Sequence, residues 1–128
     1  MERNVVGWFE IYVNDMTRAQ TFYEAVFACT LEDLPAPSDS ITMKVFPNPG
    51  MDVEASGAAG ALVHMEQMSG GGAGTIVYFS SKDCAVEIAR VADAGGTVMA
   101  EKMSIGQHGF IAMAQDTEGN MIGIHSNQ

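Results

Sequence analysis

The stretch Gly7-Trp-Phe-Glu-Ile-Tyr-Val-Asn-Asp15 decides the fold, because it returns in altered form as Gly74-Thr-Ile-Val-Tyr-Phe-Ser-Ser-Lys-Asp83. Each copy opens on glycine, continues with β-branched and aromatic residues, and ends on an aspartate that precedes a helix-like pattern. The two aspartates lie 68 positions apart (83 minus 15), a little over half of the chain. A repeat of this length predicts two copies of one supersecondary unit.

Composition bounds the class of protein. A chain of 128 residues, 47% of them hydrophobic, predicts one globular domain, 1–128. Its formal net charge of −10 argues against nucleic acid and anionic membranes as partners and favours neutral or cationic small molecules. The sequence has no signal-peptide pattern and no apolar run long enough for a membrane span, and Cys29 and Cys84 do not form a disulfide framework, so we expect a cytoplasmic protein.

The first repeat, about 5–67, reads as β-α-β-β-β. Strands are predicted over 6–13, 30–34, 41–46 and 59–65, with a turn and a variable loop after the third strand, from 47. A helix begins at Asp15 or Thr17 and ends near Ala28. Its apolar stripe is predicted to consist of Ala19, Phe22, Tyr23 and Val26.

The second repeat, about 74–127, has the same order and follows a flexible joint at 69–74. Its strands are predicted over 75–80, 97–100, 110–114 and 121–125, the last two joined by a hairpin turn over 116–120. Its helix is capped by Asp83 and ends at Gly95-Gly96, with a stripe of Cys84, Ile88, Val91 and Ala92. Neither repeat would bury much core alone, so the fold class is α+β with two modules packed together or with another chain.

The chain resembles the vicinal oxygen chelate superfamily, which includes glyoxalase I, the bleomycin-resistance proteins and extradiol dioxygenases. The resemblance rests on Val13-Asn-Asp-Met with Phe22-Tyr23, on Ser81-Lys-Asp-Cys with Ala94-Gly95-Gly96, and on Asp116-Thr-Glu-Gly-Asn. It implies that two βαβββ modules curl into a cup-shaped mixed β-sheet barrel with flanking helices. It also implies a homodimer, which would cover unpaired sheet edges.

The resemblance also points to the positions that hold a metal ion in the metal-dependent members. They fall on Trp8, Ile76, Gly123 and either Leu62 or, with a slip of two residues, His64. Tryptophan, isoleucine and glycine side chains do not bind a divalent ion. The resemblance therefore predicts a protein with no cofactor and without the usual metal-dependent chemistry.

A ring of polar side chains follows from strand alternation and the repeat: Glu10, His64, Tyr78 and His125 are expected on the concave face. A carboxylate between Phe9 and Ile11 is costly to bury unless it is paired. The alternative is a structural or half-exposed Glu10, bonded to Tyr78 or to a histidine. Trp8 could be core or ligand platform, and His125 could be solvated. His108 could gate the cup or be a surface residue.

Two functions from different classes remain open. The first is a metal-free small-molecule binding protein of the bleomycin-resistance type, with ligand contacts from Trp8, Glu10, His64, Tyr78, His108 and His125. The second is a lyase or isomerase in which Glu10 or a histidine, chiefly His125, acts as general base. A variant of the second has a shifted metal site at Glu10, His64 and His125. A purely interacting protein has no separate support in the sequence.

Overall fold

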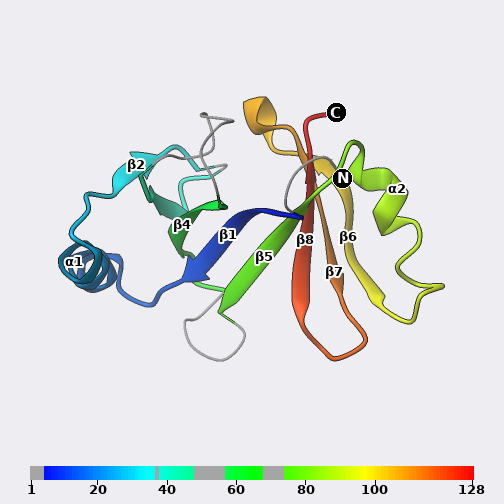
Figure 1. Cartoon of the computed structure of the whole chain (residues 1–128), viewed down its shortest axis with the longest axis horizontal. Coiled ribbons are helices and arrows are strands. Elements are labelled where there is room, and N and C mark those ends of the chain that lie inside the picture. The colour runs from blue at the N-terminus through cyan, green and yellow to red at the C-terminus, as the bar shows by residue number, and fades with distance from the viewer. Residues whose placement is uncertain (1–4, 37, 48–56, 68–73) are drawn as a thin grey trace. The chain divides into compact units, whose positions relative to one another are not determined.

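The computed structural model of the chain describes residues 5–36, 38–47, 57–67 and 74–128 (Figure 1). The chain divides into two compact units. The first unit is Trp8–Thr75, and the second unit combines Met1–Gly7 with Ile76–Gln128. Most of the predicted loop after residue 47 and of the predicted joint at 69–74 lies outside the described residues.

The first unit follows the predicted β-α-β-β-β order. Its elements are β1 (Val6–Tyr12, in this unit from Trp8 onward), α1 (Met16–Phe27), β2 (Glu32–Leu34), β3 (Thr42–Val45) and β4 (Ala59–His64). The strands are ordered β2-β3-β4-β1 in the sheet. β1 runs parallel to β4, while the β2–β3 and β3–β4 pairs are antiparallel. A parallel first and last strand requires a crossover connection, which α1 and the two strands after it supply.

Helix α1 begins and ends through local interactions. The side chain of Asp15 caps it by accepting a hydrogen bond from the backbone N–H of Arg18 at 3.0 Å, as predicted. It ends at Ala28, which adopts a left-handed conformation with φ of 51°, so that its N–H reaches the carbonyl of Glu24.

Among the described residues, no helix is long and apolar enough to cross a membrane.

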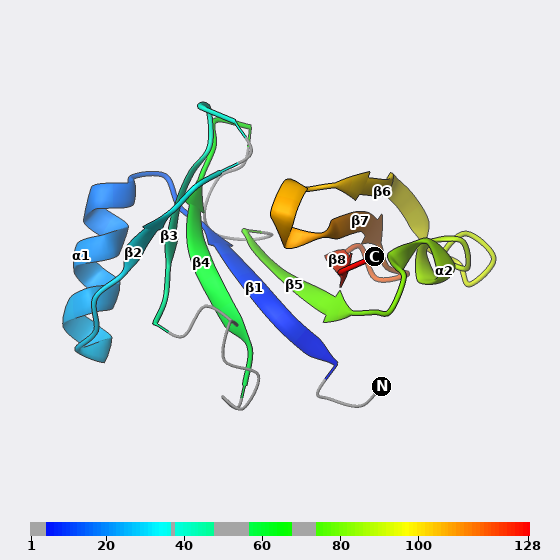
Figure 2. The same cartoon turned by 90° about the horizontal axis from the view of Figure 1, so that it is seen from above.

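The face that α1 turns toward the sheet differs from the predicted stripe. Helix α1 lies against one face of the first unit's sheet (Figure 2), where Met16, Ala19 and Tyr23 pack against the core formed by Val13, Leu31 and Leu62. By contrast, Phe22 and Val26 are each 57% exposed. In this orientation Glu24 lies partly buried, and its carboxylate accepts the N–H of Leu31 at 2.8 Å, which ties the helix to the chain before β2.

The second unit repeats the order of the first. Its elements are β5 (Thr75–Ser80), α2 (Cys84–Ile88), β6 (Thr97–Ser104), a 3₁₀ turn η1 (Gly106–His108), β7 (Phe110–Gln115) and β8 (Met121–Ser126). The strand order is β5-β8-β7-β6, with β5 parallel to β8. First and last strands again pair in parallel, so the predicted repeat and the predicted α+β class are confirmed.

Two elements of the second unit differ in length from the prediction. Helix α2 ends at Ile88, and the chain continues through turns in which Val91 N–H bonds the carbonyl of Ile88, three residues back. Ala92, expected in the stripe, is exposed. β6 runs to Ser104 instead of Ala100, because it pairs with β7 as far as Phe110 through two register shifts.

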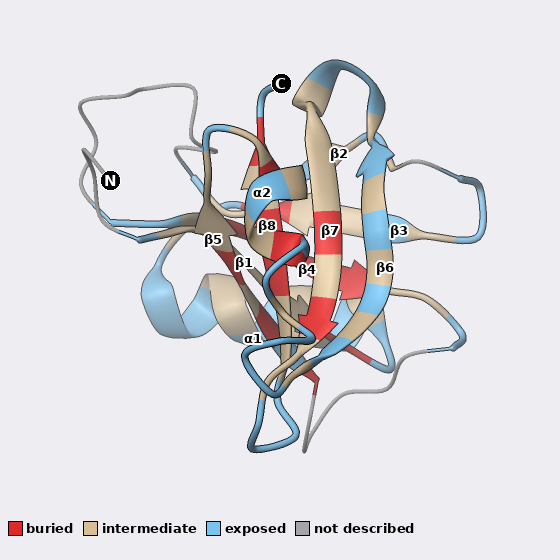
Figure 3. Ribbon diagram, turned by 90° about the vertical axis from the view of Figure 1, so that its right-hand side faces the viewer, coloured by how far each residue is buried: buried red, intermediate tan, exposed pale blue. Residues whose placement is uncertain are grey.

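The core of the second unit lies between α2 and one face of its sheet. It contains Cys84 and Ile88 from α2, Ala112 and Ala114 from β7, and Ile124 from β8. Figure 3 shows the buried segments of β7 and β8 in red. Because strand side chains alternate, the neighbours of Ile124, which are Gly123 and His125, belong to the opposite face. The core therefore decides which residues of β8 are available for a site.

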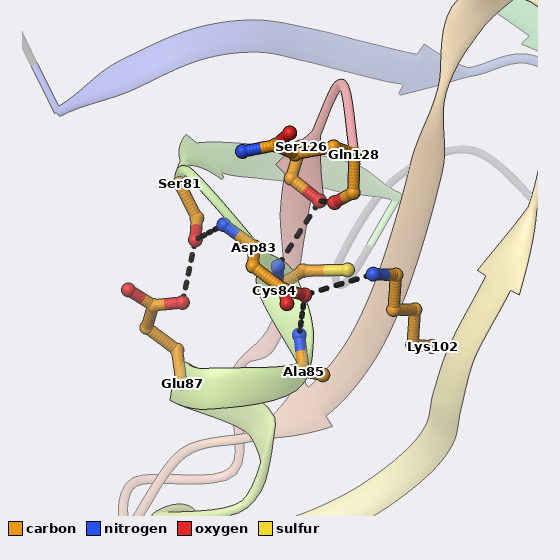
Figure 4. Close-up of polar contacts among 8 residues, drawn as sticks. All are labelled: Ser81, Asp83, Cys84, Ala85, Glu87, Lys102, Ser126 and Gln128. Atoms are coloured by element: carbon orange, nitrogen blue, oxygen red, sulfur yellow. Dashed lines mark hydrogen bonds and ion pairs between the residues drawn. The ribbon is translucent and has the colours of Figure 1, made fainter.

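Polar side chains join the start of α2 to β6 and β8 (Figure 4). The carboxylate of Asp83 accepts hydrogen bonds from Lys102 Nζ at 2.8 Å and from the N–H of Ala85 at 3.0 Å. These bonds, the one from Lys102 first, hold the pKa of Asp83 below its ordinary value. Ser126 Oγ accepts the N–H of Cys84 at 3.0 Å and donates to the carbonyl of Gln128 at 2.8 Å.

Ser126→Ala is expected to lower the free energy of unfolding by about 1–3 kcal/mol, because the buried N–H of Cys84 loses its acceptor. Ser126 is only 1% exposed, so water cannot replace the hydroxyl without rearrangement. Ser104→Ala is the matched control, because the hydroxyl of this exposed serine of β6 accepts the N–H of exposed Gly106 at 3.2 Å, which water can replace. Urea unfolding of both variants measures the difference, and equal stability of the two would show that the Ser126 bond contributes nothing.

Candidate functional site

The candidate site of the first unit is a row of side chains on one face of β1. Trp8, Glu10 and Tyr12 alternate along the strand and share a face. The residues between them face α1, since Ile11 belongs to the core around Leu62 and the ring of Phe9 lies 5.7 Å from that of Phe46. The row of Trp8, Glu10 and Tyr12 is therefore on the face that α1 leaves uncovered.

Both oxygens of the Glu10 carboxylate accept hydrogen bonds from its own strand. Trp8 Nε1 donates to Oε2 at 3.1 Å, and the hydroxyl of Tyr12 donates to Oε1 at 2.7 Å. A donor on each oxygen fixes the carboxylate in one orientation and compensates for the partial loss of water. The predicted pairing of Glu10 is thus present in the first unit, with partners that the sequence analysis did not name.

Tyr12 is the functional candidate that the sequence analysis missed. Its side chain is 8% exposed, and burial raises the pKa of the Tyr12 hydroxyl, an effect that the neighbouring charge of Glu10 reinforces. The hydroxyl therefore stays protonated and remains a donor. The signal was present in the sequence, because Trp8, Glu10 and Tyr12 follow the two-residue period of a strand.

The strand next to this row carries small side chains. In the register of β1 and β4, Trp8 lies opposite Ala59 and Glu10 opposite Ala61. A methyl group at each position places no long side chain from β4 against the carboxylate. The row on β1 therefore has the polar group, and β4 contributes an apolar wall beside it.

His64 lies on the other face of the sheet, contrary to the prediction that it would share a face with Glu10. It is two residues beyond Leu62, which packs against α1, so alternation puts His64 in the row of Leu62. Its Nδ1 lies 3.0 Å from the carbonyl oxygen of Val13. Since a carbonyl only accepts, Nδ1 carries the proton, and the ring fastens the end of β4 to the end of β1.

In the second unit, Tyr78 and His125 share a face, in agreement with the alternation argument. Tyr78 pairs with Gly123 and Ser80 with His125 in the parallel β5–β8 register, opposite to the face of Ile124. The ring of Tyr78 lies directly over Gly123. A methyl group added at Gly123 would overlap the ring atoms Cδ1 and Cε1, so only glycine leaves room for the ring.

His125 and His108 meet through the backbone. His125 Nε2 lies 2.6 Å from the carbonyl oxygen of His108 in η1. Nε2 therefore carries a proton, and in the neutral ring the lone pair is on Nδ1. His108 itself is half-buried.

The residues at the positions implied for a metal ion do not fit one. The indole N–H of Trp8 donates to Glu10, Ile76 is a buried hydrocarbon, and Tyr78 covers Gly123. Leu62 is fully buried in the first core, and His64 on that same face does not join Glu10 in the shifted site. Across the described residues, no group of three or more His, Cys, Asp or Glu side chains is arranged to hold a metal ion.

Comparison with protein families identifies the chain as a whole. The family model for the Glyoxalase/Bleomycin resistance protein/Dioxygenase superfamily matches residues 5–124. The chain belongs to this superfamily. No protein of curated function matches the sequence.

Solved structures similar to this superfamily member share its fold at low sequence identity. A variant of Streptomyces coelicolor methylmalonyl-CoA epimerase in complex with 2-nitronate-propionyl-CoA has a TM-score of 0.69 at 15% identity, with 98% of both chains covered. Methylmalonyl-CoA epimerase from Mycobacterium tuberculosis has a TM-score of 0.66 at 14% identity, covering 100% of this chain and 92% of that one. A hypothetical protein from Bacillus halodurans C-125 has a TM-score of 0.70 at 13% identity, covering 96% and 94%.

Proposed function

We propose that this superfamily member is a metal-free small-molecule binding protein whose ligand contacts the row of Trp8, Glu10 and Tyr12. The observation that carries the proposal is the carboxylate of Glu10, held by a donor on each oxygen on the face of β1 that α1 leaves uncovered. A fixed charge beside an aromatic ring and small apolar side chains has the composition of a ligand site.

The charge of the row favours a ligand with a cationic or hydrogen-bond-donating group. Glu10 attracts such a group, and the indole of Trp8 can lie against a cation. The net charge of −10 acts in the same direction over longer distances. For the second unit considered by itself, the proposal names Tyr78 and His125 as ligand contacts, with Nδ1 of the neutral His125 ring as an acceptor. It leaves out the His64 ring.

An isomerase-type enzyme is the second candidate. It is favoured by the fold that the chain shares with methylmalonyl-CoA epimerases and by two possible general bases, Glu10 and His125 Nδ1. The net charge of the chain argues against a coenzyme A ester as substrate, because the phosphates of such an ester are anionic and the chain has ten more acidic than basic residues. Incubating methylmalonyl-CoA with the protein in deuterium oxide decides between them. Catalysed exchange of the acidic C–H, lost in Glu10→Gln or His125→Ala, would favour the enzyme.

Metal analysis tests the metal-free part of the proposal. We expect well under one equivalent of Ni, Zn or Fe per chain after dialysis against each ion and then against buffer, since Trp8, Ile76 and Gly123 offer no ligand atoms. Glyoxalase activity on the methylglyoxal–glutathione adduct should also be absent. The protein should be purified without a histidine tag. One tightly held ion per chain, lost on Glu10→Ala or His125→Ala, would contradict the proposal.

The proposal also includes a homodimer as the assembled form. Each unit has a single helix on a sheet, and a closed two-fold dimer is the commonest way for such a chain to cover remaining apolar surface. The dimer is independent of ligand chemistry, so the two parts can be tested separately.

A further inference from the structure

The outward side of α1 carries an apolar surface that the fold of the first unit does not use. Phe22 and Val26 are each 57% exposed, and Phe27, at the end of the helix, is 64% exposed. The rings are held in place, because Tyr23 packs edge-on against Phe22 at 5.2 Å and stacks on Phe27 at 6.2 Å. Tyr23 itself contacts Phe46, so the surface is continuous with the core of the first unit.

This side of α1 carries no carboxylate, and one of its hydroxyl groups is already paired within the helix. We define the outer α1 face as six of its exposed residues, Thr17, Arg18, Thr21, Phe22, Ala25 and Val26; the remaining exposed residue, Phe27, ends the helix. The hydroxyl of Thr21 donates to the carbonyl of Thr17 at 2.9 Å, so it needs no water. All six residues are described, and none of them is acidic, in a chain with 16 acidic residues.

We propose that the outer α1 face is where two copies of this chain pack against each other, with their α1 helices antiparallel about a two-fold axis. Two chains of net charge −10 repel, and the repulsion is weakest where both surfaces lack carboxylates. The same charge opposes an anionic membrane as the occupant. The small side chain of Ala25, next to Val26, allows the two helix axes to come close.

The charges along α1 complement each other in this arrangement. The helix, described over its whole length, has no basic residue in its last turn and no acidic residue in its first. An antiparallel partner brings Arg18, near the amino end, toward the carboxyl end of the other copy's helix, where a cation is favourable. A parallel pair would instead place the two arginines side by side.

The size of the contact sets the expected affinity. A helix of 12 residues is about 18 Å long, so α1 alone buries less than a standard interface of roughly 800 Å² per partner. We therefore expect a dissociation constant on the order of micromolar. This inference specifies the surface of the homodimer that the proposed function includes.

Sedimentation velocity of the full chain from about 1 to 200 μM tests the proposal. Wild type should shift from monomer to dimer, and Phe22→Ser with Val26→Ser should stay monomeric throughout. Val86→Ser with Met103→Ser is the matched control, because these apolar residues of the second unit are 47% and 44% exposed, and it should follow wild type. A monomeric wild type, or an outer-face variant that dimerises like wild type, would overturn the proposal.

A disulfide trap keeps the test informative if the double variant folds poorly. Thr21→Cys, which lies close to the two-fold axis when Arg18 of one helix meets the carboxyl end of the other, should form a covalent dimer on mild oxidation, faster than wild type, which has Cys29 and Cys84, and faster than Val86→Cys. No gain over the two controls would overturn the proposal. Ligand titration followed by Trp8 fluorescence reports on the binding site and not on mass, so failure of the dimer and failure of ligand binding are distinguishable.

Discussion

Gly123→Ala is expected to lower the free energy of unfolding by about 1–3 kcal/mol, although it adds a single methyl group. The group would be built into the ring of Tyr78, which crosses directly over Gly123 in the β5–β8 pair. Tyr78 is 6% exposed, so the ring has little room to move aside. Thermal or urea unfolding monitored by far-UV circular dichroism measures the loss.

A double-mutant cycle separates this clash from a general preference for glycine. Once Tyr78→Ala has removed the ring, adding Gly123→Ala should cost at least about 1 kcal/mol less than it does in wild type. Equal costs in the two backgrounds would mean that the ring does not occupy that space. The cycle also tests why a metal ligand at this position does not fit, because any longer side chain meets the same ring.

Glu10→Ala is expected to lower the free energy of unfolding by about 1–3 kcal/mol, because the hydroxyl of Tyr12 and the indole N–H of Trp8 both lose their acceptor. Glu10→Gln should stay near wild type. Its amide oxygen can accept from Trp8, and its amide N–H can donate to Tyr12, since a hydroxyl both donates and accepts.

Glu32→Ala, at an exposed glutamate of β2, is the control for Glu10→Ala. Thermal melts of the four proteins measure the differences. Two results would contradict the hydrogen-bonded arrangement: an alanine variant as stable as wild type, or a glutamine variant as destabilised as the alanine variant. The comparison separates the structural role of Glu10 from its proposed binding role, which both substitutions should remove.

Local patterns predicted most of the fold. Asp15 and Asp83 cap their helices as expected, since a cap depends on a few neighbouring residues. The repeated β-α-β-β-β order followed from hydrophobic periodicity and the two glycine-to-aspartate stretches. The length of α2 was wrong because the pattern from Cys84 to Val91 suits a series of three-residue turns as well as an α-helix.

The remaining differences arise from tertiary packing, which one sequence does not reveal. Phe22 and Val26 fit a helical stripe, but periodicity cannot distinguish a surface toward the core from a surface toward another chain. His64 was placed on the wrong face because a shift of one residue in a strand reverses every side chain. The contact of Tyr78 with Gly123 depends on the register of β5 and β8, which the sequence did not specify.

Fluorescence titration of Trp8 tests the central claim most directly. Trp8 is the only tryptophan of the chain, and its indole donates to Glu10. Chelator-treated protein is titrated with cationic bleomycin and, separately, with anionic methylmalonyl-CoA. The account predicts saturable quenching by bleomycin that is at least about tenfold weaker in Glu10→Gln, the loss of one charge-assisted contact. No saturable change, equal affinity of Glu10→Gln, or a preference for methylmalonyl-CoA would contradict it.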